Sequence, residues 1–223
     1  MLEYDYGKMY DSFLGVNTKE PDYDDPDKES MPEALIGIIK EAGTVTEADY
    51  YRYEATPFDA LQVTCQQLSI KQTDCVVDFG CGKGRILFFF NNFYLCRVKG
   101  IEYDDELYET LLDNVAYYSV RFHGREKQIE TYHMRAEDYA VKKEDNIFYF
   151  FNPCAPNYFE TILEHIILSI EDSPRRVTLI LYYCSDEYTK ILRDMQWKQR
   201  RLIKLPGYSD DPYETMYLFQ NPL

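Results

Sequence analysis

The stretch Val76-Val77-Asp78-Phe79-Gly80-Cys81-Gly82-Lys83-Gly84-Arg85 decides how the rest of the chain is interpreted. An apolar, β-branched run reaches an aspartate, three glycines follow at alternate positions, and the apolar segment 86–90 comes next. This order predicts a buried strand, a tight turn and the start of a helix. Because glycine lacks Cβ and tolerates positive φ, the backbone of such a turn can lie close to a ligand. A helix N-terminus presents free N–H groups at the same point, so the pattern predicts a nucleotide-like ligand with an anionic group near the glycines.

The composition is that of an acidic globular protein. Its 223 residues suit one substantial domain. No apolar run approaches the length of a membrane span, and residues 1–6 lack the basic and apolar regions of a signal peptide. The six cysteines include no CxxC pair, which favours free thiols in a reducing compartment over disulfides or a zinc site. We therefore expect a cytoplasmic protein without a metal site.

The formal net charge of −15 bears on the choice of partner. A strongly acidic surface repels phosphate backbones and so disfavours general nucleic-acid binding. A small basic cluster does occur near the C-terminus, and we expect it to be a solvated strand face. Its members are Lys198, Arg200, Arg201 and Lys204.

Strand-like and helix-like segments alternate from residue 56 onward. The predicted helices are 56–69, 84–93, 104–122, 159–170 and 186–195. The predicted strands are 75–80, 97–103, 129–134, 147–152 and 177–184. Two last strand-like runs, 197–205 and 214–219, have no helix between them and should pair as an antiparallel hairpin. The pattern predicts an α/β sheet with helices on both faces.

The N-terminal part of the chain does not show this alternation of strand-like and helix-like segments. Residues 19–30 contain two prolines and many charges, which predicts an exposed acidic loop. Short helices are expected over 31–42 and 46–53. We therefore divide the chain into an N-terminal helical cap with an acidic loop, residues 1–52, and a main domain, residues 53–223.

Three kinds of nucleotide turn compete for the glycines. A P-loop needs Gly-Lys followed by Ser or Thr, which Gly82-Lys83-Gly84 does not provide. A dinucleotide turn needs a small residue at the sixth position of GxGxxG, where this chain has Arg85. The third kind is the Asp-x-Gly-x-Gly-x-Gly turn that begins at Asp78. It resembles the first motif of the class I S-adenosylmethionine-dependent methyltransferases.

That resemblance extends from about Tyr53 to the C-terminus. It implies a Rossmann-like three-layer sandwich with a seven-stranded mixed sheet of order 3-2-1-4-5-7-6. It also implies S-adenosyl-L-methionine as the cofactor and S-adenosyl-L-homocysteine as the product. The expected cofactor contacts are Tyr53, Thr56, Asp78, Phe79, Gly80, Gly82, Gly84, Glu102, Tyr103, Ala136, Glu137 and Asn152.

Several of these residues have expected roles. Glu102 ends the second strand 24 residues after Asp78, where a carboxylate can accept the ribose hydroxyl protons. Asp78 would orient the glycine turn or approach the methionine ammonium, and Tyr53 and Thr56 would close over the methionine end. Asn152 is the candidate catalytic residue, because its amide can hold a substrate amine or hydroxyl beside the methyl group. An Asn-Pro turn without a ligand role explains Asn152 almost as well.

The segment Asn152-Pro153-Cys154-Ala155 only partly resembles the Asn-Pro-Pro-aromatic box of amino-methylating enzymes. Pro153-Cys154 is also similar to the Pro-Cys nucleophile of cytosine-C5 methyltransferases, but no companion motif accompanies it. We therefore expect Cys154 to be a pocket-lining thiol.

The functional expectation is a methyltransferase acting on a nitrogen or oxygen of a protein side chain or small molecule. One alternative is a regulatory or interaction protein that binds S-adenosylmethionine without turnover. Another is a nicotinamide-dependent oxidoreductase, which Arg85 and the terminal hairpin disfavour. The acceptor itself has no motif that the sequence identifies.

Overall fold

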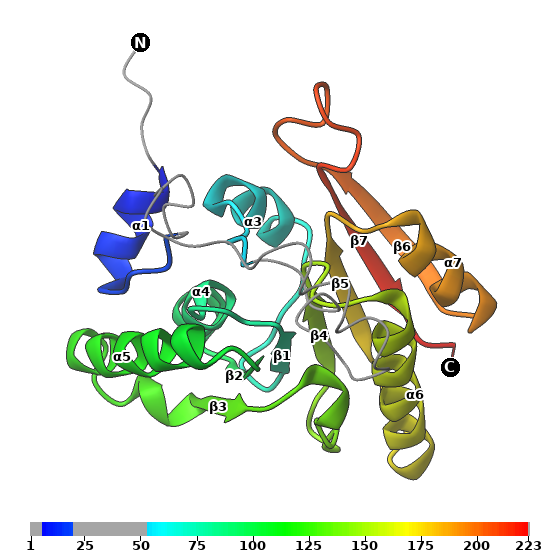
Figure 1. Cartoon of the computed structure of the whole chain (residues 1–223), viewed down its shortest axis with the longest axis horizontal. Coiled ribbons are helices and arrows are strands. Elements are labelled where there is room, and N and C mark those ends of the chain that lie inside the picture. The colour runs from blue at the N-terminus through cyan, green and yellow to red at the C-terminus, as the bar shows by residue number, and fades with distance from the viewer. Residues whose placement is uncertain (1–5, 20–52, 223) are drawn as a thin grey trace, which may run out of the picture.

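The computed structural model describes residues 6–19 and 53–222 and contains one seven-stranded mixed sheet (Figure 1). The sheet order β3-β2-β1-β4-β5-β7-β6 confirms the predicted topology. Strands β1 to β5 are parallel, and β7 runs antiparallel between β5 and β6. The strands are β1 (Cys75–Phe79), β2 (Arg97–Glu102), β3 (Ile129–His133), β4 (Ile147–Phe150), β5 (Thr178–Tyr182), β6 (Lys198–Lys204) and β7 (Thr215–Gln220).

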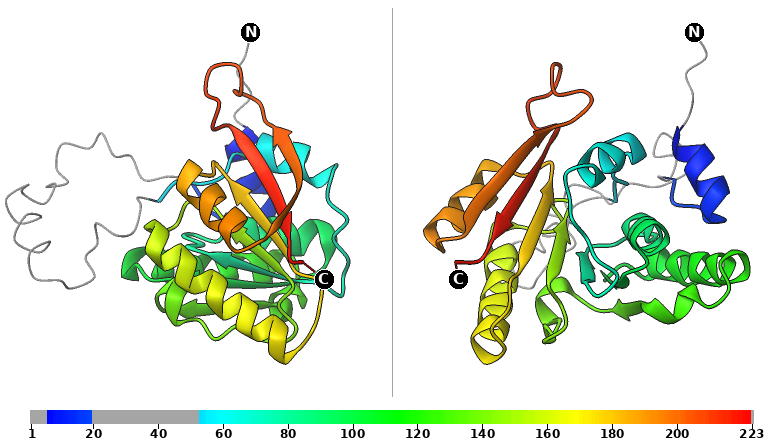
Figure 2. Two further views of the ribbon diagram at one scale, coloured as in Figure 1. Left: turned by 90° about the vertical axis from the view of Figure 1, so that its right-hand side faces the viewer. Right: turned by 180° about the vertical axis from the view of Figure 1, so that it is seen from behind.

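Helices cover both faces of the sheet (Figure 2). The helices are α1 (Tyr6–Leu14), α3 (Phe58–Cys65), α4 (Arg85–Tyr94), α5 (Asp105–Arg121), α6 (Pro156–Asp172) and α7 (Asp186–Asp194), with short 3₁₀ helices η2 (Arg125–Gln128) and η3 (Ala136–Asp138). Helices α3, α4 and α5 share one apolar core with one face of the sheet, and α6 and α7 share the other.

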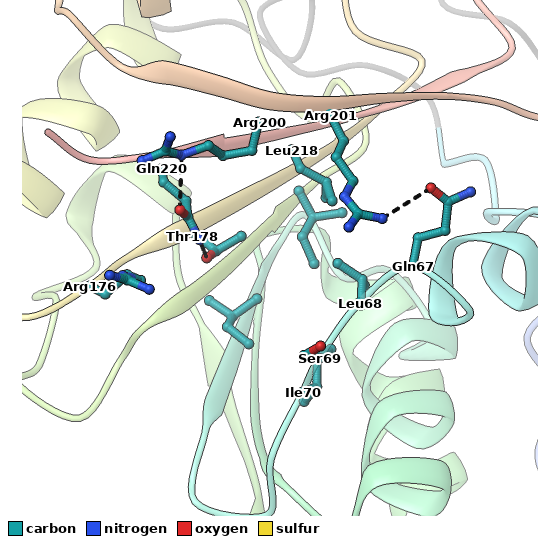
Figure 3. Close-up of a pocket in the computed structure, with 12 residues that line it drawn as sticks. Gln67, Leu68, Ser69, Ile70, Arg176, Thr178, Arg200, Arg201, Leu218 and Gln220 are labelled. Carbon is teal, nitrogen blue, oxygen red and sulfur yellow. Dashed lines mark hydrogen bonds between the residues drawn. The ribbon is translucent and has the colours of Figure 1, made fainter.

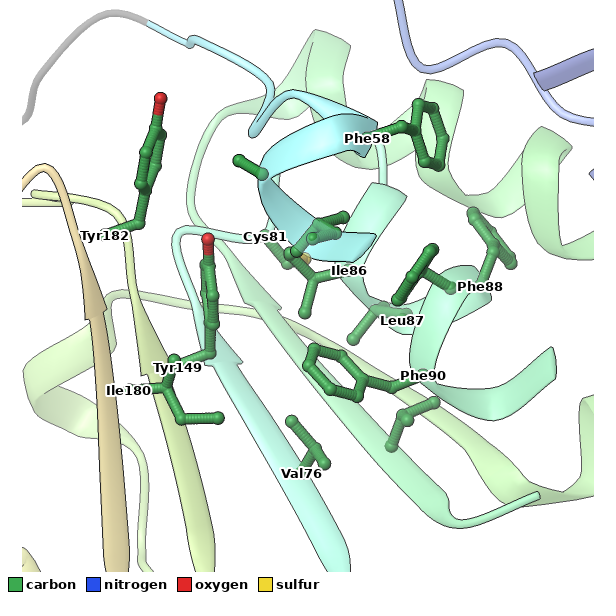
Figure 4. Close-up of a cluster of buried hydrophobic side chains, with 14 of the residues drawn as sticks. Phe58, Val76, Cys81, Ile86, Leu87, Phe88, Phe90, Tyr149, Ile180 and Tyr182 are labelled. Atoms are coloured by element: carbon green, nitrogen blue, oxygen red, sulfur yellow. The ribbon is translucent and has the colours of Figure 1, made fainter. Parts of the chain in front are cut away.

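Alternating strand residues separate the two cores. Val76 and Tyr149 belong to the core beneath α3 and α4, which Figure 4 shows, whereas Val77 and Phe148 belong to the core beneath α6. Every residue of β1 is buried, as expected for a strand covered on both faces. The carboxyl ends of the parallel strands β1, β4 and β5 therefore lie together at one end of a rigid scaffold. The glycine turn begins there, directly after β1.

The element boundaries differ from the prediction in a few places. Helix α3 ends at Cys65 instead of Ser69, and Pro57 is its N-cap. Strand β4 ends at Phe150, two residues before Asn152. Helix α1 was not predicted; it packs on α3 and α4 through Tyr10, whose ring lies 4.7 Å from that of Phe58. The helices expected over 31–42 and 46–53 lie outside the described residues, apart from Tyr53, which is not helical.

Lys99 is an unexpected charge inside the sheet. It stands in the middle of β2 with its side chain fully buried, and its ammonium lies 2.8 Å from Asp145 and 3.1 Å from Glu144. Asp145 also accepts hydrogen bonds from the Tyr139 hydroxyl and the Lys142 amide. Because a buried ion is tolerated only with good partners, this network allows a lysine in a central strand.

No helix within residues 6–19 and 53–222 is long and apolar enough to cross a membrane. Over the same residues, no group of three or more histidine, cysteine or acidic side chains is placed to hold a metal ion.

Candidate functional site

The glycine turn joins β1 to α4, which confirms the predicted strand, turn and helix. Gly82 and Gly84 have φ of +51° and +88°. A Cβ on Gly84 would lie 2.5 Å from a methyl carbon of Leu111, and one on Gly82 would lie 2.0 Å from the ring of Tyr53. Larger residues would therefore be strained at both positions and would displace either α5 or Tyr53.

Asp78 lies just before the turn and carries a buried carboxylate. Its side chain is 3% exposed. Burial, and then the nearby charge of Glu102, hold the pKa of Asp78 well above its usual range. The carboxylate makes no hydrogen bond with any of the described residues. A buried carboxylate without a partner is costly, and a cationic group placed beside it would relieve that cost.

Glu102 ends β2 and is bound to the same turn. One carboxylate oxygen accepts from the Gly82 amide at 2.7 Å, and the other accepts from the amides of Tyr103 and Asp104 at 2.8 and 2.9 Å. Burial raises the pKa of Glu102, and these three amides oppose that shift. A carboxylate has about four acceptor positions, so this arrangement leaves room for a ligand hydroxyl.

The residues after β2 and β3 lie together. The Arg135 guanidinium is 4.6 Å from the centre of the Tyr103 ring, and Tyr103 is 38% exposed. Ala136 is buried at the start of η3, and the Glu137 carboxylate lies 3.9 Å from Arg135. A flat group could therefore contact Tyr103 and the backbone of η3. Phe79 differs from these residues, because its side chain is buried in the opposite core.

The stacking partners of Phe79 are Phe148 and Phe150, with ring centres 6.0 and 5.2 Å away. Only the backbone of Phe79 is therefore placed to meet a ligand at the turn.

Asn152 follows β4 beside the glycine turn. A Cβ on Gly80 would lie 2.8 Å from the Cβ of Pro153, so the two loops are in contact. Asn152 has φ of +42°, is half-buried and makes no hydrogen bond with the described residues. Tyr183, which follows β5, also has a positive φ of +51°. Left-handed backbone is uncommon outside glycine, and its occurrence at two adjacent strand ends is typical of a functional edge.

Cys154 lies in the interior of the protein and exposes no surface of its side chain. Its side chain is fully buried in the core beneath α6 and α7. The hydroxyl of Tyr188 donates to the Cys154 carbonyl at 2.6 Å. Burial raises the pKa of the thiol to about 12. Cys154 therefore stays protonated at neutral pH and cannot serve as a nucleophile.

An aromatic and acidic rim surrounds the ends of β4 and β5. Its rings are Phe151, Tyr182, Tyr183 and Tyr213, with successive ring centres 4.5 to 6.1 Å apart. The Tyr183 hydroxyl donates to Asp211 at 2.6 Å, and the Tyr182 hydroxyl donates to Glu214 at 2.9 Å. The hydrogen bond to Asp211 raises the pKa of Tyr183 to about 12, so this phenol is neutral at pH 7. The rim therefore combines ring faces with two carboxylates.

Arg85 binds the N-terminal segment to the turn. Its guanidinium donates to the hydroxyl and carbonyl of Thr18, at 2.8 and 3.0 Å, and to the carbonyls of Ala55 and Thr56, at 3.3 and 3.0 Å. The Tyr53 hydroxyl also donates to the Thr18 carbonyl, at 2.8 Å. We call this arrangement the Arg85 clamp. The sequence showed only that Arg85 is too large for a dinucleotide turn.

Asn114 of α5 adds to these contacts. Its amide donates to the carbonyls of Asn17 and Lys83, at 2.9 and 3.0 Å, and its oxygen accepts from the Asn17 amide at 2.8 Å. An asparagine inside an amphipathic helix gives no sequence signal for this role. Asn114 lies under the glycine turn and connects this turn to the N-terminal segment.

The side chain of Thr56 is more deeply buried than a residue that contacts a ligand needs to be. It is 3% exposed, and its hydroxyl is 2.7 Å from that of Tyr149. In Figure 4 the hydroxyl groups of Tyr149 and Tyr182 point in the same direction. The side chain of Thr56 thus joins the segment after Tyr53 to the end of β4.

Comparison with known proteins supports the fold alone. No protein-family model and no curated protein sequence matches this chain. An RNA methyltransferase from Salinibacter ruber, in complex with S-adenosyl-L-homocysteine, superimposes with a TM-score of 0.55 at 18% identity, over 77% of this chain and 94% of that one. TYW2 of P. horikoshii, in complex with MeSAdo, gives 0.52 at 13% identity, over 79% and 65%.

The mitomycin 7-O-methyltransferase MmcR gives a TM-score of 0.55 at 10% identity, over 74% of this chain and 53% of that one. These three structures share the fold of this chain, and two of their names state different methylated substrates, namely RNA and mitomycin. The likeness confirms the fold.

Proposed function

We propose that this chain, which has the class I methyltransferase fold, binds S-adenosyl-L-methionine and transfers its methyl group to a nitrogen or oxygen of an acceptor. The observation that carries the proposal is the pair of buried carboxylates, Asp78 and Glu102, on either side of a glycine turn that has no space for side chains. Two of the structurally similar proteins, an RNA methyltransferase and TYW2, were solved with S-adenosyl-L-homocysteine and MeSAdo respectively, which agrees with this choice of cofactor.

The residues of the site fit the chemical groups of this cofactor. Asp78, which has no hydrogen-bond partner among the described residues, is suited to the amino-acid ammonium. Glu102 is suited to a ribose hydroxyl, and the half-exposed Tyr103 to the adenine ring. Ala136 and Glu137 would meet the adenine edge, and Tyr53, held over Gly82, would cover the methionine end.

When bound, the cofactor supplies a methyl group on a sulfonium, which an aligned nucleophile can displace. The contribution of the chain is to position the acceptor and to exclude water. Asn152 offers an amide oxygen and two N–H donors at the edge of the site, so it would orient the acceptor atom. Tyr183 and Cys154 both have a pKa raised to about 12, so neither is a general base at neutral pH.

The rim favours nitrogen as the methylated atom. Phe151, Tyr183 and Tyr213 present ring faces beside Asp211 and Glu214, whereas Tyr182 is 2% exposed and supports the rim from the core. Ring faces and carboxylates both attract cations. An amine-bearing small molecule or a basic protein side chain therefore suits the rim, whereas a phosphate backbone would meet repulsion there and from the net charge of −15.

A binding protein without turnover is the second candidate. It is supported by the unusually dense contacts of the turn with Tyr53 and the Arg85 clamp. Transfer of a labelled methyl group into any fraction of a cell extract, separated into protein, nucleic acid and small molecules, distinguishes the two. Label in the protein or small-molecule fraction supports the enzyme, and none in any fraction supports the binding protein.

Cofactor identity is tested by titration calorimetry with S-adenosylmethionine and with NAD. We expect S-adenosylmethionine to bind and NAD not to bind. Glu102→Ala should weaken the binding by about 1–3 kcal/mol, because a charge-assisted hydrogen bond is lost and the Gly82 amide is left without its acceptor. Glu106→Ala, an exposed acid in the first turn of α5, is the control and should bind as the unmodified chain does.

Preference for NAD, or an unchanged affinity in the Glu102→Ala variant, would overturn the proposal. Circular dichroism of each variant separates lost binding from lost folding.

A further inference from the structure

A pocket lies on the α3 side of the sheet, away from the glycine turn. Its volume is about 460 Å³ (Figure 3). Ile147 and Thr178, the first residues of β4 and β5, lie in its wall, as does Gln220 at the end of the antiparallel β7. The glycine turn follows the carboxyl end of β1. The pocket therefore lies at the opposite end of the parallel strands, where β4 and β5 begin. The segment 67–70 closes the near side of the pocket, and residues 67–69 of it were expected to belong to the helix that in the structure ends at Cys65.

Three arginines line this pocket, and no acidic residue does. Arg176, Arg200 and Arg201 form no ion pair with a carboxylate in the described part of the chain. The partners of Arg200 and Arg201 are the neutral amides of Gln220 and Gln67, at 3.0 and 3.4 Å. In a chain with 39 acidic and 24 basic residues, three guanidinium groups without a carboxylate are an uneven distribution of charge.

A β-bulge lets two successive arginines of β6 line the same pocket, with the Arg200 side chain directed toward Gln220 and the Arg201 side chain toward Gln67 (Figure 3). The pairing of β6 with β7 shifts between Gln199 and Arg201, so Arg200 is an extra residue in β6. In a regular strand, Arg200 and Arg201 would point to opposite faces of the sheet. With the bulge, both line the same pocket, and Figure 3 shows both on the same side of the strand. Bulges redirect side chains in this way beside functional sites.

The floor of the pocket is apolar. It is formed by side chains from the segment after α3 and from three strands, namely Leu68, Ile70, Ile147, Ile180 and Leu218. A pocket of this volume accepts a small molecule, and the apolar floor with three arginines suits a ligand that has both an apolar body and an anionic head. Arginine forks match the oxygen geometry of phosphate.

We propose that this pocket binds a small phosphate-bearing molecule whose apolar or ring-shaped body rests on the floor. The guanidinium groups of Arg176, Arg200 and Arg201 are the candidate contacts for the phosphate. The same group on a nucleic-acid backbone is disfavoured, because the net charge of −15 repels a long polyanion. The proposal is independent of methyl transfer, because the two sites share no residue.

The test is calorimetric titration of the full chain with phenyl phosphate, pyrophosphate and a single-stranded hexanucleotide. We expect phenyl phosphate and pyrophosphate to bind. The double variant Arg200→Gln/Arg201→Gln should weaken this binding about tenfold or more, since each removed arginine takes away a charge-assisted hydrogen bond. Arg176→Gln should weaken it to a similar extent.

The matched control is Lys198→Gln/Lys204→Gln. These lysines lie in the same strand and carry the same total charge, but they do not line the pocket. We expect the control to bind within about twofold of the unmodified chain, because exposed charges that make no contact contribute little. Thermal melting of both double variants shows whether the hairpin is intact.

Three results would overturn the proposal. The first is no binding of phenyl phosphate or pyrophosphate by the unmodified chain at millimolar concentration. The second is an equal loss in both double variants, which would indicate diffuse charge instead of a site. The third is binding of the hexanucleotide alone.

Discussion

At the scale of single residues, Asp78 combines a cost to stability with a use in binding. Its carboxylate is 3% exposed, has no hydrogen bond to the described residues and lies near the negative charge of Glu102. Its pKa is therefore raised in the folded chain. Ionisation at neutral pH destabilises the fold, and the same charge is what would attract an ammonium group.

We predict that Asp78→Asn stabilises the ligand-free protein at pH 7.5 by about 1–3 kcal/mol, because folding no longer has to bury or protonate a carboxylate that has no partner among the described residues. The sign follows from the raised pKa. The unfolded carboxyl ionises near pH 4 and the folded one at higher pH, so the stability of the unmodified chain falls between these two values. The advantage of the variant should shrink as the pH is lowered toward 4.

Thermal melting at several pH values measures this advantage, at about 2–4 °C per kcal/mol. Titration calorimetry should show weaker S-adenosylmethionine binding by the same variant. Asp113→Asn, on the exposed face of α5, is the control and should change neither quantity. A variant less stable than the unmodified chain at pH 7.5 would contradict this account of Asp78.

For Asn152 we predict that replacement by glycine lowers methyl transfer more than cofactor affinity. Glycine accepts the positive φ of +42°, so the variant loses the amide without backbone strain. The transfer rate should fall about 100-fold, the scale of losing the alignment of a reacting group. Single-turnover transfer into the labelled fraction measures it.

Gln196→Gly is the matched control, because Gln196 also has a positive φ, of +64°, and lies at the end of α7. An Asn152→Gly variant as active as this control would show that Asn152 is only a turn residue.

At the scale of elements, the Arg85 clamp connects α4 to two segments that are distant in sequence. We predict that Arg85→Lys loosens residues 16–18 and 53–56, because a single ammonium cannot replace four hydrogen bonds from a planar fork. Hydrogen exchange of these amides should speed up, with a loss of about 1–3 kcal/mol in unfolding free energy. Binding of S-adenosylmethionine should weaken as well.

The control is Arg193→Lys, an exposed arginine in the last turn of α7. Exchange that stays unchanged at residues 16–18 in the Arg85→Lys variant would contradict the clamp.

Elements with strong local patterns were predicted well from the sequence. The alternation of apolar strands with amphipathic helices predicted the five parallel strands, and the absence of a predicted helix between the last two strand-like runs predicted the hairpin. The order of the strands in the sheet followed from the family resemblance. Element ends were less accurate. The run 147–152 was expected to be strand throughout, but β4 ends at Phe150 and the backbone has a positive φ at Asn152.

Long-range partners account for the remaining differences. The sequence around Lys99 gives no reason to expect a buried side chain. Its partner Asp145 lies 46 residues later in the chain, and only the fold brings the two together. Asn114 and Arg85 meet the N-terminal segment across 97 and 67 residues. The glycine turn itself could be predicted, because the strand before it, the three glycines and the helix after it form one local sequence pattern. Arg176 and Arg200 become neighbours only through sheet pairing and a bulge.

At the scale of the whole molecule, β7 has a consequence for the order of assembly. Strand β6 touches the rest of the sheet only through β7, which lies between it and β5. During synthesis from the N-terminus, β6 is made before β7. It cannot pair with the sheet until residues 215–220 have been made. Until then β5 is an open sheet edge, and open edges invite pairing with other chains. The pocket with its three arginines is therefore among the last features of the molecule to form.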